Sequence, residues 1–530
     1  MNSTLDLTGD KPYLLWGTAP TVPAGKNRIL RRALEMLPGT LAWTTFFCAV
    51  LFSWLQPVWV ALFIIAFDIY WILRAIYLAI LALFTYGRLR RTRKIDWLKR
   101  LEDLPTTRYS LYTIHSWKDV YHLVILPMFQ EGEEVVRPTL GALAHVRYPK
   151  ERLLVVLALE ERAGKSSQKL AHRMQNDFKE SFGAFLITTH PQDIVGELSG
   201  KGSNEAWAAR KAVELLIDAA RIPYEHVLVS SLDIDTHLEP DYFLCVTYHY
   251  LTAEKPLRSS YQPIPLFNNN IWDAPAFSRI AATSNTVWQL MQQQRPEAME
   301  TFSSHSMPLK ALVEIGFWNT KVVSEDSLIF YQCLLAYDGD WQIVPLYYPV
   351  SMDANLAKST LRTAYNVYRQ QRRWGYGAEK IAYTLTGFIK NKHIPFRKKI
   401  RYAYLMIEGF WMWPCAAIII FALGWLPLAL GGEAFRESVL GFRLPTLTRA
   451  ILTIGMVGML VNGALSLLLM PPKPKRVAGW VYATLVLQWV LFPVTVIIFG
   501  ALPALEAQTR LMLGRYMGFW VTEKVRKDKK

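Results

Sequence analysis

Long apolar stretches lie near both ends of the chain and enclose a middle part in which apolar runs are short. Residues 39–56 carry no charge, and residues 58–87 form a longer apolar run that only Asp68 and Arg74 interrupt. A helix needs about 20 apolar residues to cross a bilayer. Charges inside such a helix are costly unless it packs against protein. We therefore expect a transmembrane hairpin over residues 38–88.

Three further apolar runs cover roughly residues 404–431, 449–470 and 477–502. Basic residues flank both ends of the first hairpin, and the C-terminal tail is also basic, which marks these segments as cytoplasmic. Three crossings would leave the tail outside. We therefore expect an even number of crossings, with one run re-entrant, in the membrane plane or folded back on itself. The pattern predicts an integral protein of a bacterial inner membrane whose middle part is cytoplasmic.

The middle part, residues 105–355, alternates between strand-like and helix-like segments. The runs at 122–127, 153–159 and 225–233 are rich in β-branched residues, and residues 204–220 have helical periodicity. Such alternation predicts a mainly parallel sheet with helices on its faces. Ligands bind such sheets at the carboxyl ends of the strands.

Composition agrees with apolar blocks joined to a charged domain. The chain has 530 residues, of which 52% are hydrophobic, and a formal net charge of +16. A basic excess can indicate nucleic acid, anionic lipid or phosphorylated substrates. Here the basic residues gather beside apolar runs, where membrane topology explains them, so we expect no nucleic-acid partner. The four cysteines form no CxxC pair, so neither a zinc site nor a disulfide framework is indicated.

Two aspartates follow an apolar strand in the segment SSLDIDTHLEP. Asp233 and Asp235 are two residues apart, which places both carboxylates on one face of an extended chain. Carboxylate oxygens suit Mg²⁺ or Mn²⁺, which often complete their shells with substrate phosphates. An acidic turn after a strand is the alternative reading.

A second acidic pair follows Val322 and Val323. Glu325 and Asp326 stand where a carboxylate could take a proton from an attacking hydroxyl. The alternative is a helix start, with Ser324 as N-cap and the acids in the first turn. Both can hold together, because a capped helix start is a rigid mount for a base.

Lys201 lies between two glycines before an expected helix. The segment is not a P-loop, because Val195 stands where that pattern requires glycine. Lys201 could still hold a phosphate near the helix N-terminus. The alternative is an ordinary turn with Asn204 as the helix cap.

A basic and aromatic strip, YRQQRRWGYG, covers residues 368–377. If residues 356–388 are helical, Gln370, Arg373 and Trp374 share one flank. Arginine suits a diphosphate, and tryptophan offers a flat face for a sugar ring. Taken alone, the strip favours an interfacial helix whose arginines meet lipid phosphates and whose aromatic residues lie at head-group depth, and Arg369 and Arg372 are free for that role.

The order of these motifs resembles that of the membrane-integrated family-two glycosyltransferases, which include cellulose, chitin and hyaluronan synthases. Their catalytic domain has the GT-A fold, and their motif series runs from an acidic residue to DxD, a TED-type triplet and QxxRW. This chain has Asp233-Ile234-Asp235, then Ser324-Glu325-Asp326, then Gln370-Gln371-Arg372-Arg373-Trp374. FWVTEK at 519–524 is similar to the FxVTxK gating loop of cellulose synthases. The resemblance covers roughly residues 38–525.

The resemblance implies a role for each matching residue. Asp326 would be the general base, Asp235 the metal ligand with Asp233 in support, and Trp374 the acceptor platform. Contacts to the donor would come from Glu160, Glu161, Lys201, Gln370, Arg373, Phe519, Val521, Thr522 and Lys524. Glu160 and Glu161 replace the aspartates that the family usually has. The segment before the triplet has His305 but lacks the cysteine of cellulose synthases, and Asn268 to Asn270 could line a sugar channel.

The implied activity is that of an inverting, metal-dependent glycosyltransferase. It would move a sugar from a nucleotide-diphosphate donor, most simply a UDP-sugar, to a growing β-linked polysaccharide. The alternatives are transfer of one sugar to a lipid, as in ceramide glucosyltransferases, and a non-catalytic membrane scaffold or transporter. The sequence does not indicate an oligomeric state.

The resemblance and the hydrophobic pattern together divide the chain into six parts. They are a cytoplasmic segment at 1–37, the hairpin at 38–88, the GT-A domain at 105–355, interface helices with QxxRW at 356–400, transmembrane helices at 401–505, and an interface helix with the gating-loop-like tail at 506–530.

Overall fold

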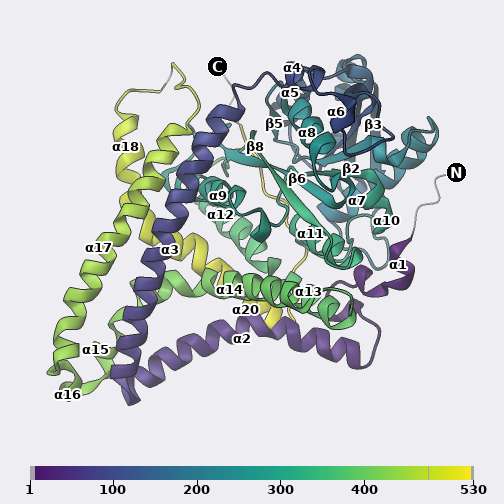
Figure 1. The fold of residues 1–530 in the computed structure, drawn as a ribbon. Helices are drawn as coiled ribbons and strands as arrows, with labels where there is room; N and C mark the ends of the chain where they lie inside the picture. Colours follow the sequence, from purple (N-terminus) through teal and green to yellow (C-terminus); the bar gives the residue numbers. More distant parts are fainter. Residues whose placement is uncertain (1–5, 476, 527–530) are drawn as a thin grey trace.

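The computed structural model of the protein describes residues 6–475 and 477–526. The expectations for residues 1–5 and 527–530 therefore lie outside the described residues. A mixed sheet with flanking helices occupies one side of the molecule, and long helices extend from it on the other (Figure 1).

The sheet has eight strands in the order β3-β2-β1-β4-β7-β6-β8-β5. β1 to β4 run parallel to one another, and β6 pairs in parallel with β8. β7 and β5 join in antiparallel pairs. The mainly parallel sheet expected from the sequence is thus confirmed. The strands are β1 Tyr121–Met128, β2 Leu153–Glu160, β3 Ala184–His190, β4 Val227–Ser231, β5 His237–Leu238, β6 Ser259–Phe267, β7 Ser306–Pro308 and β8 Gln342–Met352.

Helices cover both faces of the sheet, which explains why β1, β2 and β4 are buried along nearly their whole length. One core packs α5 Glu133–Ala144, α6 Lys165–Phe178 and α8 Tyr242–Thr252 against the sheet. The other packs α7 Lys201–Ala212, α10 Leu309–Glu314 and α11 Glu325–Ala336. α4 Trp97–Glu102 contacts α8 at the edge of the first core.

Three further helices connect the sheet to the long apolar helices. They are α9 Ala276–Gln293, α12 Thr360–Gly375 and α13 Glu379–Lys390. α12 and α13 are separated by one turn of 3₁₀ helix, so the expected helical stretch is two helices. The short helix α1 Leu7–Asp10 lies near the N-terminus and precedes α2 Lys26–Leu55.

Among the described residues, five helices are long and apolar enough to cross a membrane. The first four are α2 Lys26–Leu55, α3 Pro57–Thr92, α14 Phe396–Phe421 and α17 Val439–Leu468. The fifth is the run Val481–Met512, which contains α18 Val481–Leu487, α19 Phe492–Val496 and α20 Leu502–Met512. α15 Leu426–Leu430 and α16 Gly432–Arg436 lie between α14 and α17.

The run Val481–Met512 contacts other parts of the molecule near both of its ends. Near its start, the Trp272 and Tyr482 ring centroids are 5.8 Å apart. At its end, Arg32 donates to the Leu511 carbonyl oxygen at 2.7 Å. A Cβ on Gly375 would lie 2.8 Å from Cα of Ala504, so α12 and α20 touch backbone to backbone. The start of this run therefore lies beside the loop that leads into α9, and its end lies beside α12 and the first part of α2.

Candidate functional site

A cavity of about 290 Å³ opens at the carboxyl ends of β1, β2 and β4. Residues from α9, α12, α14 and the C-terminal tail close it on the other sides. Its lining includes most residues that the sequence singled out, namely Glu160, Lys201, Asp233, Asp235, Asp326, Gln370, Arg373, Trp374, Phe519, Val521, Thr522 and Lys524. The topology therefore brings motifs from distant parts of the chain to one place.

The two aspartates after β4 differ in their surroundings. The side chain of Asp235 is 3% exposed, whereas that of Asp233 is 25% exposed. Asp235 accepts a hydrogen bond from the Asp353 backbone at 3.1 Å and pairs with Lys524 at 2.7 Å. Burial raises the pKa of Asp235, and the Lys524 ammonium opposes this only in part. Burial acts in the same direction on Asp233, but the Lys201 and Lys524 ammoniums outweigh it and lower the pKa of that carboxyl.

Lys201 joins the DxD pair to the acidic triplet. Its ammonium lies 2.8 Å from Asp233 and 2.7 Å from Asp326. Burial disfavours the charged form, but the surrounding carboxylates raise the Lys201 pKa well above its usual value. α7 begins at Lys201, so Asn204 is not its cap. Asn204 instead donates to the Ala158 carbonyl oxygen at 2.7 Å.

The start of α11 presents the acidic triplet to the cavity. Ser324 occupies the N-cap position, but its hydroxyl donates to Glu379 at 3.0 Å and caps no helix amide. Glu379 also accepts from the backbone amides of Val323 and Ser324, at 2.7 Å and 3.0 Å. Burial raises the pKa of Glu379 to about 7. This carboxyl therefore holds the loop that leads into α11, whose first turn carries Asp326.

α12 turns only part of the basic strip toward the cavity. Gln370, Arg373 and Trp374 line it, whereas Arg372 pairs with Glu506 of α20 at 2.6 Å. Arg369 lies 4.6 Å from the centroid of the Trp520 ring. Arg369 and Arg372, expected as interfacial charges, thus each have a partner in the C-terminal region and remain partly exposed.

The C-terminal tail enters the cavity. Arg373 stacks over the Phe519 ring at 4.6 Å, and a Cβ on Gly200 would lie 2.5 Å from Cβ of Phe519. Thr522 is 7% exposed, and its hydroxyl has no hydrogen-bond partner within the described part of the chain. Beyond Lys524, Arg526 forms a bidentate contact with the buried Asp353, with 2.7 Å between Nη2 and Oδ1.

Other expected contacts lie apart from the cavity. Glu160 lines the cavity. Glu161 instead accepts a hydrogen bond from the backbone amide of Gln192 at 2.9 Å and borders a shallow surface hollow beyond β2 and β3. His305 is fully buried, its ring bonded to the Phe302 carbonyl oxygen, and burial lowers its pKa to about 4. Asn268 to Asn270 donate to the backbone carbonyls of Leu469, Asp235 and Ala354, so these side chains organise the loop.

Several residues at the site were missed by sequence reasoning. Glu131 lines the cavity, and burial raises its pKa although Lys524 is near. Asp353 follows β8 and accepts hydrogen bonds from the Arg526 guanidinium. Glu205 lies 3.7 Å from the Lys201 ammonium, on the side away from the cavity. Glu131 follows an apolar strand, as Asp233 does, so its position was a usable signal. Asp353 and Glu205 have no local pattern that marks them.

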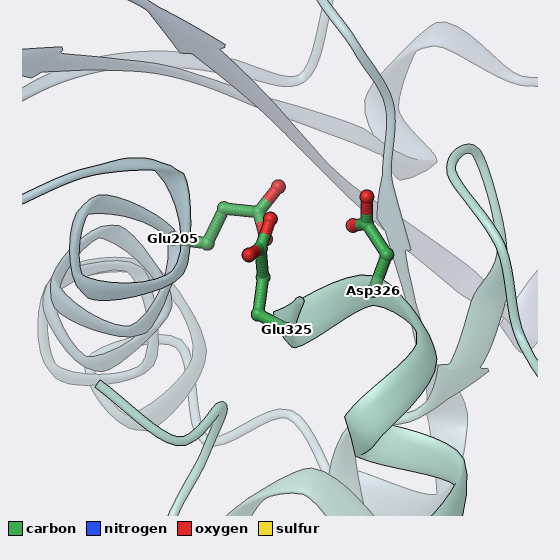
Figure 2. A group of neighbouring side chains, drawn as sticks. All are labelled: Glu205, Glu325 and Asp326. Carbon is green, nitrogen blue, oxygen red and sulfur yellow. The ribbon is translucent and has the colours of Figure 1, made fainter. Parts of the chain in front are cut away.

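Two clusters of carboxylate side chains offer the oxygen ligands that a divalent cation prefers. Oxygens of Glu205, Glu325 and Asp326 lie within 4.8 Å of one another (Figure 2). The Lys201 ammonium lies within 3.9 Å of the same carboxylates, so a cation of the chain already neutralises this cluster. At the DxD pair, the cation beside Asp235 is the tail residue Lys524. Because a cation of the chain lies there, the oxygens of Asp233 and Asp235 are suited to a hard cation such as Mg²⁺ or Mn²⁺.

Comparison with known proteins agrees with this architecture. The sequence profile described as "Glycosyl transferase family group 2" matches residues 228–505, just over half of the chain. The mannosyltransferase PcManGT from Pyrobaculum calidifontis, solved with GDP-Man and Mn²⁺, is 14% identical, with a TM-score of 0.38, over 74% of this chain and 99% of that chain. TarS 1–349 of S. aureus, solved with UDP-GlcNAc, is 12% identical, with a TM-score of 0.30, over 68% and 95% of the two chains. Both structural likenesses are weak. No curated protein matches the chain.

The mainly parallel sheet, with acidic residues at the carboxyl ends of its strands, is a GT-A glycosyltransferase fold. The chain belongs to glycosyl transferase family group 2.

Proposed function

We propose that the protein is an inverting, metal-dependent glycosyltransferase that extends a β-linked polysaccharide at a membrane, with a UDP-sugar as donor. The observation that carries this proposal is the convergence of the DxD pair, Asp326, the QxxRW residues and the tail on one cavity. The same cavity reaches Phe410 and Trp413 of the apolar helix α14, so an acceptor chain bound there lies beside the membrane helices.

The catalytic step assigns one task to each side chain. Asp326 removes the proton from the acceptor hydroxyl, whose oxygen attacks the anomeric carbon from the face opposite the diphosphate. The bond from that carbon to the diphosphate oxygen breaks, and its electron pair leaves with the diphosphate. Inversion converts an α-linked donor into a β-linked product.

The other cavity residues bind and orient the substrates. Arg373 and Gln370 hold the diphosphate, and the guanidinium offsets its growing charge. A divalent cation held by Asp233 and Asp235 supplies further stabilisation of the leaving diphosphate. Trp374 packs edge-on against Phe302, which orients its ring as a platform for the acceptor sugar. Phe519, Val521, Thr522 and Lys524 cover the donor from the tail.

An even number of crossings and a cytoplasmic catalytic domain complete the proposal. Support comes from the contacts of the run Val481–Met512, both of whose ends lie beside the catalytic side of the molecule. Crossings by α2, α3, α14 and α17 alone leave the N-terminal segment, the catalytic domain and the tail on one side.

Purified protein in nanodiscs with Mn²⁺ and a panel of UDP- and GDP-sugars tests the function through nucleotide release and product mass. A ladder of products with one UDP-sugar supports polymer synthesis. A product in which a lipid carries one sugar would favour the lipid-acceptor alternative. The cavity residues of α14 could border a lipid acceptor as well as a polysaccharide chain. Absence of nucleotide release with every donor would overturn the proposal.

A further inference from the structure

Glu205 is a buried carboxyl group directly behind the cavity, and the proposed chemistry does not use it. It lies on α7, one turn after Lys201, and its side chain is 0% exposed. The Ser231 hydroxyl donates to one of its oxygens at 2.6 Å. The other oxygen has no hydrogen-bond partner among the described residues. A buried carboxyl is costly to keep, so its retention calls for a physical reason.

Glu205 and Glu325 together form the inner wall of a socket around the Lys201 ammonium. The nitrogen lies 3.7 Å from Glu205 and 3.9 Å from Glu325. Figure 2 shows the carboxyl groups of Glu205 and Glu325 close together, with Asp326 to one side. Neither oxygen of Glu325 has a hydrogen-bond partner in the described chain. The lysine is thus held between two inner carboxyls and the outer pair Asp233 and Asp326.

The two helices that build the socket are in close contact. A Cβ on Gly202 would lie 3.0 Å from Cβ of Glu325, so α7 approaches the start of α11 as closely as a glycine allows. Ser231 is the last residue of β4, two positions before Asp233. The bond from Ser231 to Glu205 therefore ties the strand that carries the DxD pair to the helix that carries Lys201.

We propose that Glu205 is a positioning residue that holds the Lys201 ammonium against Asp326. The inference deepens the proposed function, since it explains how the lysine is aimed at the base. Without the inner wall, the flexible four-carbon stem of lysine could take other rotamers. The carboxylate of Asp326 would then lose the partner that orients it.

The charge on Glu205 determines which variants are informative. Burial raises the pKa of Glu205, although Lys201 opposes this, so the surroundings favour the neutral form of that carboxyl. Glutamine reproduces the length and the acceptor oxygen of that neutral form. Leucine keeps the volume but removes both oxygens. Glu205→Gln is therefore the conservative variant and Glu205→Leu the disruptive one.

The first measurement needs no substrate. Amine-specific acylation of the full-length protein, followed by peptide mass spectrometry, reports the reactivity of Lys201. We expect Glu205→Leu to raise the acylation rate of Lys201 several-fold, because loss of the inner oxygens leaves the flexible side chain free to move out of the socket and meet the reagent. Glu205→Gln should stay close to the parent rate. Ser231→Ala, a milder change, should raise the rate in the same direction and covers the case that Glu205→Leu fails to fold.

The second measurement is turnover with the donor identified by the screen. Glu205→Leu should lower kcat by roughly 10- to 100-fold, the effect expected when a catalytic group is misplaced, with little change in KM for the donor. Glu205→Gln should restore kcat to within about threefold. In a Lys201→Met background, Glu205→Leu should add no further loss, because its target is gone.

Glu314→Gln is the matched control, because Glu314 is a buried carboxyl of the same domain that accepts from Tyr337 at 2.7 Å, away from the cavity. Unchanged acylation of Lys201 in both Glu205→Leu and Ser231→Ala would overturn the inference. So would equal kcat losses in Glu205→Leu and Glu314→Gln. Failure of every donor would overturn the proposed function and still leave the acylation result to decide about Glu205.

Discussion

The ammonium of Lys524 lies 2.7 Å from Oδ1 of Asp235, although the two residues are 289 positions apart in the chain. The contact closes the C-terminal tail over the carboxylate that suits a metal ion. Because Asp235 is buried, it needs a cationic partner. Lys524 and a divalent cation can each meet that need, so cation binding and the position of the tail are linked.

Replacement of Asp235 by asparagine should abolish most cation-dependent turnover. The amide keeps the size of the side chain but loses the charge that binds both the cation and Lys524. Because metal stabilisation of a leaving group is worth several kcal/mol, we expect a loss of roughly 100-fold or more in kcat at saturating Mn²⁺. Nucleotide release measured over a Mn²⁺ titration checks this. If the variant turns over like the parent at low Mn²⁺, Asp235 is not a ligand of the cation.

Asp326→Asn should separate catalysis from binding. The variant keeps the shape of the side chain but cannot accept the proton of the acceptor hydroxyl, so we expect kcat to fall by roughly 10²–10⁴-fold. UDP affinity, measured by calorimetry, should remain within a few-fold of the parent. Asp340→Asn provides the control, because that carboxylate is 51% exposed and pairs with Lys255. Full activity of Asp326→Asn would eliminate it as the base.

The contact between Arg526 and Asp353 should restrain the tail. Asp353→Asn removes the charge that receives the guanidinium, and a charge-assisted hydrogen bond is worth about 1.5–3 kcal/mol. Tryptic cleavage after Lys524 should therefore become roughly tenfold faster or more. Mass spectrometry of the C-terminal peptide over time gives the rate, with Asp340→Asn again as control. Equal rates in the parent and Asp353→Asn would show that this pair does not hold the tail.

Glu379 should make stability depend on pH. Burial raises its pKa in the folded protein to about 7, above the ordinary value of 4.5, so the folded state binds the proton more tightly than the unfolded chain does. Its contribution is fully present below pH 4.5 and is lost as pH rises toward 7, at up to about 1.4 kcal/mol per pH unit.

Glu379→Gln removes this dependence and keeps an oxygen that can accept from Val323 and Ser324. The variant should therefore match the parent near pH 5 and exceed it in melting temperature near pH 8. Thermal unfolding of the two proteins in the same detergent at both pH values measures the difference. A difference in melting temperature that does not change with pH would contradict the assignment of Glu379.

Much of the fold was predictable, because its signals are local. The apolar runs at 122–127 and 153–159 correspond to β1 and β2, since strands covered on both faces are apolar throughout. Asp233, Asp235 and Asp326 were also recognisable, because each follows an apolar segment at a spacing that places its carboxylate at the end of a strand or the start of a helix.

The remaining features depend on contacts between distant residues. Glu160 and Glu161 look equivalent in the sequence, yet only Glu160 lines the cavity, because the turn after β2 directs Glu161 to the Gln192 amide. Arg369 and Arg372 were expected as interfacial charges, but each has a partner in the C-terminal region, Trp520 and Glu506 respectively. The periodicity of α12 does not indicate which face of this helix α20 and the tail contact.

The sequence by itself therefore determined the alternation of strands and helices, the apolar helices and the order of the acidic and QxxRW motifs. These follow from hydrophobic periodicity and from the chemistry of single residues. Only the tertiary structure decided that Lys524 meets Asp235, that Glu205 lies behind Lys201 and that Arg32 contacts the end of the run Val481–Met512. Those outcomes depend on packing and charge pairing between segments far apart in the chain, for which local sequence holds no signal.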